Sequence, residues 1–245
     1  MNQNIYDNND FFAEYKETRE KDTSYNNLLE QPVMALLLPN LKGKRILDIG
    51  CGAGYNCKQF IEKGAAFCLG IDISNNMLSL AKSMNFDKNI EYKNLAIQDL
   101  SIIKDKFDFI YSSLAFHYVE DYSKIFYDIK NLLKSSGELL FSIENPVKTA
   151  SKADTKWHKD ENGNSIYYEL SDYLTEGERT AKWLDSSVIK YHHSFSYIIN
   201  ALIKNNFLIE YMEEPLPNPD AILKNPKLAR EHHAPCFLII KARVE

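Results

Sequence analysis

The sequence lacks the segments that would direct a chain into a membrane or out of the cytoplasm. The 245-residue chain begins with a polar and aromatic segment that has neither the basic nor the apolar region of a signal peptide. The apolar run nearest to this start, Val33 to Leu38, is far too short to span a bilayer. We therefore expect a cytoplasmic protein with no membrane span.

Cysteine is scarce and shows no metal-binding pattern. No C-x-x-C pair and no nearby histidine-rich segment accompany the four cysteines, Cys51, Cys57, Cys68 and Cys236. This spacing disfavours the common zinc signatures, and we expect reduced thiols and no metal site.

The chain also lacks an excess of basic charge. It has 29 basic and 34 acidic residues, a net charge of -5, and no long block of like charge. A nucleic-acid partner is therefore not expected. Hydrophobic residues make up 44% of the chain, enough to build a full core, so a folded α/β protein is predicted rather than a disordered one.

The stretch from Lys44 to Asp72 organises the rest of the chain. It predicts a strand, a glycine loop, a helix, a second strand and a terminal acid, at Ile46–Ile49, Gly50–Gly54, Tyr55–Lys63, Ala65–Ile71 and Asp72. A βαβ unit of this size is typical of proteins that bind a nucleoside-bearing cofactor. The competing interpretation is a glycine turn that only packs the helix on the strand.

The alternation of strands and helices continues after this unit. Further strands are predicted at 90–94, 107–112, 138–143, 207–212 and 236–242, and further helices after Ser74, at 122–133 and at 195–204. Gly137 is expected to end the helix before the fifth strand in a left-handed conformation. The predicted fold is an α/β, Rossmann-like, doubly wound sheet of seven mostly parallel strands, the last antiparallel.

Two regions lie outside this alternation. Residues 1–43 are predicted to form an N-terminal arm with helices at 10–20 and 25–38, the second bent or restarted at Pro32. Residues 44–245 form the main domain, in which 145–191 is a polar, aromatic and irregular insert. An insert that follows the carboxyl end of a strand is typical of a lid or a binding element.

Four loops are expected to meet at one edge of the sheet. The glycine loop, Asp72, residues 96–99 and residues 112–117 each follow a predicted parallel strand. Ligands of such sheets bind at the carboxyl ends of the strands, so this convergence favours a cofactor site over a glycine turn that serves packing alone.

The sequence resembles the class I S-adenosylmethionine-dependent methyltransferases. The residues that carry the resemblance are LDIGCGAG, GIDIS, FDFIYSSLAFHYVED and KSSGELLFSIENP, between Lys44 and Pro146. The branch most similar to it acts on small molecules and includes the ubiquinone and menaquinone biosynthesis methyltransferases. The G-x-G-x-G spacing differs from the G-x-G-x-x-G of dinucleotide binders.

The resemblance implies S-adenosylmethionine as cofactor, S-adenosylhomocysteine as product, no metal, and a set of cofactor contacts. The methionine and ribose parts are expected to contact Asp48, Gly50, Cys51, Gly52 and Gly54, with the ribose hydroxyls at Asp72. The adenine is expected to contact Ile73, Met77, Ile97 and Gln98. Many relatives carry an acid where Ala96 stands, and the contact made by that acid is either absent here or supplied by Asp99. Ser112 and Leu114 are expected beneath the methionine tail. Arg19 and Tyr25 of the arm could clamp the cofactor carboxylate.

A catalytic base is needed only where the attacking atom is a protonated oxygen or nitrogen. His117 and Glu144 are the candidates that follow the fourth and fifth strands, and either could instead serve packing or solvation. His158, His192 and His193 are further candidates, and a surface role is expected for His192 and His193, as for His232 and His233. An aromatic cap over the acceptor could include Tyr15, Tyr25, Trp157, Tyr168, Trp183 and Tyr191.

The leading hypothesis is therefore transfer of a methyl group to a small molecule by in-line displacement. Two alternatives remain at this point, a methyltransferase with a protein acceptor and a non-enzymatic module that binds S-adenosylmethionine. The sequence predicts neither the acceptor nor the oligomeric state.

Overall fold

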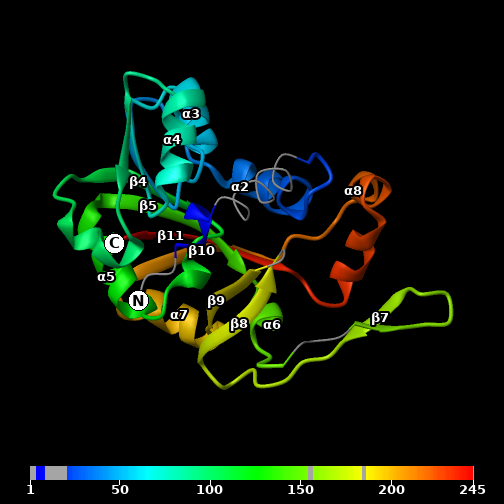
Figure 1. The fold of residues 1–245 in the computed structure, drawn as a ribbon. Helices are drawn as coiled ribbons and strands as arrows, with labels where there is room; N and C mark the ends of the chain where they lie inside the picture. Colours follow the sequence, from blue (N-terminus) through cyan, green and yellow to red (C-terminus); the bar gives the residue numbers. More distant parts are fainter. Residues whose placement is uncertain (1–3, 9–20, 154–156, 184–185, 245) are drawn as a thin grey trace.

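The computed structural model describes residues 4–8, 21–153, 157–183 and 186–244. Within these residues a seven-stranded sheet lies at the centre of the molecule, in the order β10-β11-β5-β4-β1-β2-β3 (Figure 1). Its strands are β1 (Arg45–Ile49), β2 (Phe67–Asp72), β3 (Ile90–Asn94), β4 (Phe107–Ser113), β5 (Leu133–Glu144), β10 (Phe207–Glu213) and β11 (Phe237–Val244). β1 to β5 run parallel, whereas β11 runs antiparallel to both of its neighbours. The predicted fold class is confirmed.

Helices cover both faces of the sheet. α2 (Gln31–Leu37), α3 (Tyr55–Glu62) and α4 (Asn75–Met84) pack on one face, and α5 (Tyr122–Leu132) and α7 (Phe195–Lys204) on the other (Figure 1). β1 is buried on both sides, from Ile46 to Ile49. This two-sided burial explains why the sequence of β1 is a short apolar run rather than an alternating pattern.

The start of β5 differs from the expected one. β5 begins at Leu133, directly after α5, and residues 135–137 lie within it, where its pairing with β4 shifts register. Ser136, not Gly137, adopts the left-handed conformation, with φ of 58°. A Cβ at Gly137 would lie 2.9 Å from the carbonyl oxygen of Lys134, so the glycine allows a close backbone approach. The predicted helix end with a left-handed cap at Gly137 is therefore wrong.

The N-terminal arm packs on the domain in two described pieces. A short helix, η1 (Ile5–Asp7), lies beside the start of α4, and a π-helical turn, η2 (Asn26–Glu30), runs directly into α2. Pro32 stands in the first turn of α2, where its missing N–H leaves no helical bond unmade. The expected restart at Pro32 is confirmed, while the helix predicted at 10–20 lies outside the described residues.

The insert is more regular than its sequence indicates. After α6 (Pro146–Thr149) come two antiparallel hairpins, β6 (Trp157–Lys159) with β7 (Ser165–Tyr168), and β8 (Gly177–Trp183) with β9 (Ser186–His192). The first hairpin extends away from the sheet, and the second lies beside α6 (Figure 1). The connection after β10 contains α8 (Pro219–Lys224) and a 3₁₀ segment, η5 (Pro226–His232). The division into arm, domain and insert stays a prediction.

Two 3₁₀ segments follow strands at the carboxyl edge of the sheet. These are η3 (Ile97–Ile102), after β3, and η4 (Phe116–Tyr118), after β4. In the described part of the chain, none of the helices has the length and apolarity needed to cross a membrane.

Glu30 fastens the arm to the sheet. Its side chain is fully buried. One carboxylate oxygen accepts hydrogen bonds from Ser113 at 2.7 Å and Ser142 at 2.5 Å, at the ends of β4 and β5. The other accepts from Asn26 at 2.5 Å and Gln31 at 2.7 Å. The burial of this charge is thus compensated by four donors.

Replacing Glu30 by alanine should lower the free energy of unfolding by about 3 kcal/mol, because buried donors lose a charged acceptor. The matched control is Glu62→Ala, at an exposed position of α3, where a change within about 0.5 kcal/mol is expected. Urea unfolding of both variants measures the difference. Equal losses in the two variants would contradict this account of Glu30.

Candidate active site

A cavity of about 1000 Å³ lies at the carboxyl edge of the parallel strands. The loops after β1, β2, β3 and β4 all contribute to its wall, as the strand order requires. Sequence-predicted residues that line it are Tyr25, Gly50, Gly52, Asp72, Ile73, Met77, Ile97, Gln98, Leu114, His117 and Glu144. The predicted convergence of loops is therefore present in the structure.

The glycine loop turns sharply back on the sheet. Gly50 has φ of 73°, and a Cβ there would lie 2.6 Å from the Cβ of Ala115, so no larger residue fits without a shift. Gly52 also has a positive φ, but a Cβ there would meet no atom within 4 Å, because the residue faces the cavity. The loop after β1 thus offers backbone, rather than side chains, to a ligand.

Asp72 holds the glycine loop and faces the same cavity. One carboxylate oxygen accepts the Gly52 N–H at 2.9 Å, and the other accepts the Ser74 N–H at 2.9 Å. Burial raises the pKa of Asp72, and the two backbone N–H groups offset this only in part. Each oxygen keeps a further lone pair for ligand hydroxyl groups.

The arm closes the cavity beside Asp72, which the sequence did not indicate. Ile5 and Tyr6 of η1 line the cavity. Asp7 accepts hydrogen bonds from the Ser74 hydroxyl at 2.6 Å and the Asn76 N–H at 3.0 Å, at the start of α4. Burial raises the pKa of Asp7, but its hydrogen bonds outweigh burial and the net shift is downward. A charged Asp7 therefore fastens η1 to the helix N-terminus.

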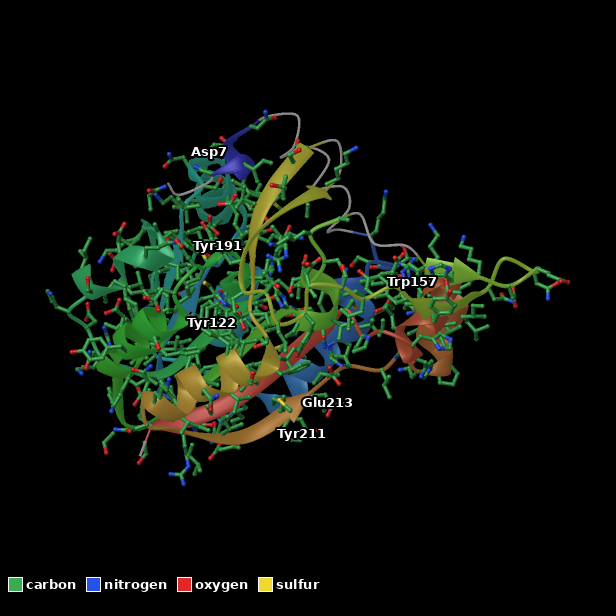
Figure 2. The ribbon with its side chains drawn as sticks, turned by 90° about the horizontal axis from the view of Figure 1, so that it is seen from below. Asp7, Tyr122, Trp157, Tyr191, Tyr211 and Glu213 are labelled. Atoms are coloured by element: carbon green, nitrogen blue, oxygen red, sulfur yellow. The ribbon has the colours of Figure 1, made fainter. Side chains whose placement is uncertain are left out.

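Aromatic and charged side chains line the cavity on the side of the insert. Tyr25, Trp157, Tyr168 and Tyr191 contribute rings there, as the sequence predicts. Figure 2 places Trp157 beside the segment of α8 and η5, away from Asp7 and Tyr191. Lys148, Arg230 and Glu231 join these rings, and the sequence did not single them out. Tyr15, Arg19 and the side chain of Trp183 lie outside the described residues.

Comparison with known proteins identifies the family. A family model described as a methyltransferase domain matches residues 47–141. A solved S-adenosylmethionine-dependent methyltransferase from Mesorhizobium loti is 38% identical, with a TM-score of 0.81, over 87% of this chain and 97% of that one. The chain belongs to the S-adenosylmethionine-dependent methyltransferases.

Two relatives differ in how much of the length of this methyltransferase they match. An uncharacterized protein of Haemophilus influenzae is 37% identical over 98% of this chain and 96% of its own. A ubiquinone biosynthesis O-methyltransferase of Neisseria meningitidis serogroup C is 34% identical, but over only 43% of this chain and 46% of its own. The predicted resemblance to ubiquinone methyltransferases is thus confirmed as a partial match.

The described residues of this methyltransferase fit its cofactor. Gly50 and Gly52 leave backbone open to the cavity, Asp72 presents a carboxylate suited to ribose hydroxyls, and Ile73 and Met77 add apolar contact. Among the described residues no group of three or more histidine, cysteine or acidic side chains could hold a metal ion. The residue-by-residue assignment of the cofactor contacts stays a prediction.

Five of the predicted cofactor residues do not line the cavity: Asp48, Cys51, Gly54, Asp99 and Ser112. A Cβ at Gly54 would lie 2.3 Å from the Tyr92 hydroxyl, so packing explains this glycine. Ser112 donates to the carbonyl of Ile49 at 2.9 Å. Asp48 lies behind the loop, 1% exposed, and accepts from the Cys57 thiol at 3.3 Å. Asp48 and Ser112 thus contact residues on either side of the glycine loop, Ile49 before it and Cys57 after it.

The two predicted bases line the cavity, but their environments do not favour proton uptake. The Nδ1 of His117 accepts the Glu144 N–H at 3.4 Å, so the neutral ring carries its proton on Nε2. Burial lowers the pKa of His117 to about 4. Glu144 accepts from Lys190 at 2.5 Å, and Lys190 and His117 lower its pKa despite burial. His117 is thus a neutral hydrogen-bond donor, and Glu144 is half of an ion pair.

His192 and His193 are buried, so the surface role expected for them is wrong. His192 contacts the Thr149 hydroxyl at 2.9 Å and the Tyr173 carbonyl at 2.8 Å. His193 contacts the Val119 carbonyl at 3.0 Å. Residues at the end of β9 point to opposite sides, and the domain covers both sides. His158 is partly exposed and stacks on Tyr167.

Asp48 gives this methyltransferase a pH-dependent stability. Burial raises the pKa of Asp48 from 3.8 to about 7, so the folded state holds a proton that the unfolded state loses between these values. Its charge should cost on the order of 4 kcal/mol above pH 7 and nothing below pH 4. Asp48→Asn should therefore unfold at higher urea than the parent protein at pH 8, with an advantage that shrinks toward pH 4.

Asp108→Asn is the control of opposite sign. Burial raises the pKa of Asp108, but the hydrogen bonds from Lys134 and the Arg45 N–H outweigh burial, and the net shift is downward. The stabilisation by its charge is complete above the usual pKa and is lost as pH falls below about 4, so Asp108→Asn should be less stable than the parent protein at pH 8, with a deficit that shrinks only below about pH 4. An Asp48→Asn variant that is destabilised equally at pH 8 and pH 4 would refute the assignment.

Proposed function

We propose that this methyltransferase transfers the methyl group to a small-molecule acceptor by in-line displacement. The observation that carries the proposal is the single cavity, which joins the cofactor loops to the aromatic and charged residues of the arm and insert. Its volume of about 1000 Å³ is at the upper end of the range of roughly 300–1,000 Å³ for pockets that hold one small ligand. A cavity more than three times the lower limit of this range is consistent with a cofactor and one further small molecule.

The chemistry makes modest demands on the protein. The cofactor supplies the electrophilic methyl group, and the chain must orient the acceptor and exclude water. Ile5 and Tyr6 from the arm, with Tyr191 from β9, cover the cavity from outside the sheet. His117, neutral and buried, can donate a hydrogen bond from Nε2 into the cavity, and the Glu144–Lys190 pair holds opposite charges beside it.

The properties of His117 and Glu144 restrict the type of acceptor atom. A pKa of about 4 makes His117 a weak base near neutral pH, and Glu144 is already paired. An acceptor atom that is nucleophilic without strong base assistance suits this site better than an alcohol of high pKa. The catalytic roles predicted for these two residues are retained only as positioning and charge-balancing roles.

Cofactor binding tests the assignment of the cavity. S-adenosylhomocysteine should bind the purified protein in calorimetry, and Asp72→Ala should weaken binding on the order of 10- to 100-fold, through loss of charged hydrogen bonds. Asp105→Ala, at an exposed carboxylate that pairs with Arg45, should leave the affinity unchanged. Absence of binding to the parent protein would remove the basis of the proposal, and an unaffected Asp72 variant would place the ribose elsewhere.

The class of acceptor is tested with labelled S-adenosylmethionine. Label should be incorporated into the small-molecule fraction when the protein is incubated with cell extract separated by size. Incorporation into the protein fraction alone would favour the alternative of a protein acceptor.

A further inference from the structure

The end of the cavity near the insert contains a charged cluster that the cofactor assignment does not use. This cluster comprises Lys148 on α6, Trp157 on β6, Tyr168 on β7, and Arg230 and Glu231 on η5. β5 lies two strands from β1 in the sheet, and α6 begins just after β5. At about 4.8 Å per strand, β5 is offset from β1 by roughly 10 Å along the sheet, and the cluster and the glycine loop line the same cavity.

Lys148 is held by rings and not by a carboxylate. Its ammonium lies 4.2 Å from the centre of the Trp157 ring and 4.3 Å from that of Tyr168. No hydrogen-bond acceptor or ion-pair partner for this ammonium is found in the part of the chain that the structure describes. The pKa of Lys148 is lowered to about 8. Burial is the main cause and Arg230 acts in the same direction, while Glu231 and Cys236 oppose the shift. This desolvated cation can therefore gain a hydrogen-bond acceptor from a ligand.

Arg230 adds a second cation to the same cluster. Its guanidinium lies 5.1 Å from the Trp157 ring and 5.8 Å from the Tyr25 ring. Its Nε lies 3.4 Å from the Oε1 of Glu231. The bidentate geometry of a guanidinium suits a carboxylate or a phosphate.

Glu231 carries an oxygen that needs a donor. The side chain is 1% exposed, and its Oε2 has no hydrogen-bond partner, although the residue lines the cavity. An unpaired buried carboxylate oxygen is costly, so a hydroxyl or amine of a ligand at this position would be favourable. Because two cations face one carboxylate, the cluster as a whole favours a negative ligand group.

We propose that this cluster binds the methyl acceptor through an anionic group, a carboxylate or a phosphate, held between Lys148 and Arg230. A hydroxyl or amine of the same molecule donates to Glu231. This inference rests on the proposed function, since the ligand of the cluster is taken to be the methyl acceptor. It specifies a small acid with a hydrogen-bond donor, in place of an unspecified small molecule.

Small molecules of similar shape but different charge test whether the cluster prefers an anionic group. We expect 3-hydroxyphenylacetate to bind the complex with S-adenosylhomocysteine at least 10-fold more tightly than 3-hydroxyphenylacetamide or 3-hydroxybenzylamine in calorimetry. Phenyl phosphate distinguishes the two anionic groups by its affinity relative to phenylacetate. Equal or tighter binding of the amide or amine, or no binding of either anion at millimolar concentration, would overturn the inference.

Variants expected to weaken and to strengthen anion binding distinguish recognition of the acceptor from a purely structural role of these residues. Lys148→Met and Arg230→Gln should each weaken 3-hydroxyphenylacetate about 10-fold, the effect of about 1.4 kcal/mol. Glu231→Gln should strengthen phenylacetate, because repulsion of the anion is removed while the side-chain shape is kept. Lys224→Met, at an exposed position of α8, should change neither affinity. Unchanged affinity in the Lys148 variant, or weaker phenylacetate binding in the Glu231 variant, would contradict the proposal.

The cofactor provides an internal control for these measurements. Each variant should bind S-adenosylhomocysteine within about two-fold of the parent protein, which shows that it is folded. If the parent protein fails to bind this molecule, the proposed function fails. If the molecule binds but the probes show no preference for anions, only the acceptor inference fails.

Discussion

The reversal of strand order at β1 is the constraint on which the rest of the structure depends. β2 and β3 extend the sheet from one side of β1, and β4 and β5 from the other. The chain therefore leaves the carboxyl ends of β1 and β4 in opposite directions, and a crevice opens between their loops. The near contact of Gly50 with Ala115 is the floor of that crevice, where the loops after β1 and β4 meet.

Local patterns predicted the fold and the cofactor end of the cavity. β1 and β2 are short apolar runs that lead directly into Gly50 and end in Asp72, so composition and spacing within about 30 residues locate them. Asp72 is predictable for the same reason, because it follows its strand directly. The left-handed residue was predicted one position too late, because Ser136 adopts the conformation that glycine usually adopts, while Gly137 allows close contact with the backbone of Lys134. Such exchanges between neighbours depend on packing that the sequence does not display.

The arm and the insert were less predictable because their contacts join distant parts of the chain. Asp7 contacts α4, and Glu30 contacts the ends of β4 and β5, through hydrogen bonds that leave no periodic trace in the sequence. Arg230 and Glu231 lie in a proline-rich connection, and only the tertiary structure places Arg230 beside Trp157. His192 and His193 show the converse: adjacency correctly predicts opposite directions, but only the tertiary structure shows that both directions are buried.

Buried charged side chains are paired within the protein at one end of the cavity and incompletely paired at the other. Near the cofactor loops, Asp72 and Glu30 have both carboxylate oxygens bonded by backbone or side-chain donors. At the insert, Lys148 has aromatic faces in place of a counter-ion, and Glu231 has one oxygen unpaired. Unsatisfied groups that are buried raise the free energy of the fold, and they persist where a ligand can satisfy them. The charged groups near the cofactor loops are thus paired within the protein, whereas the insert end keeps charged groups with which an acceptor can form hydrogen bonds.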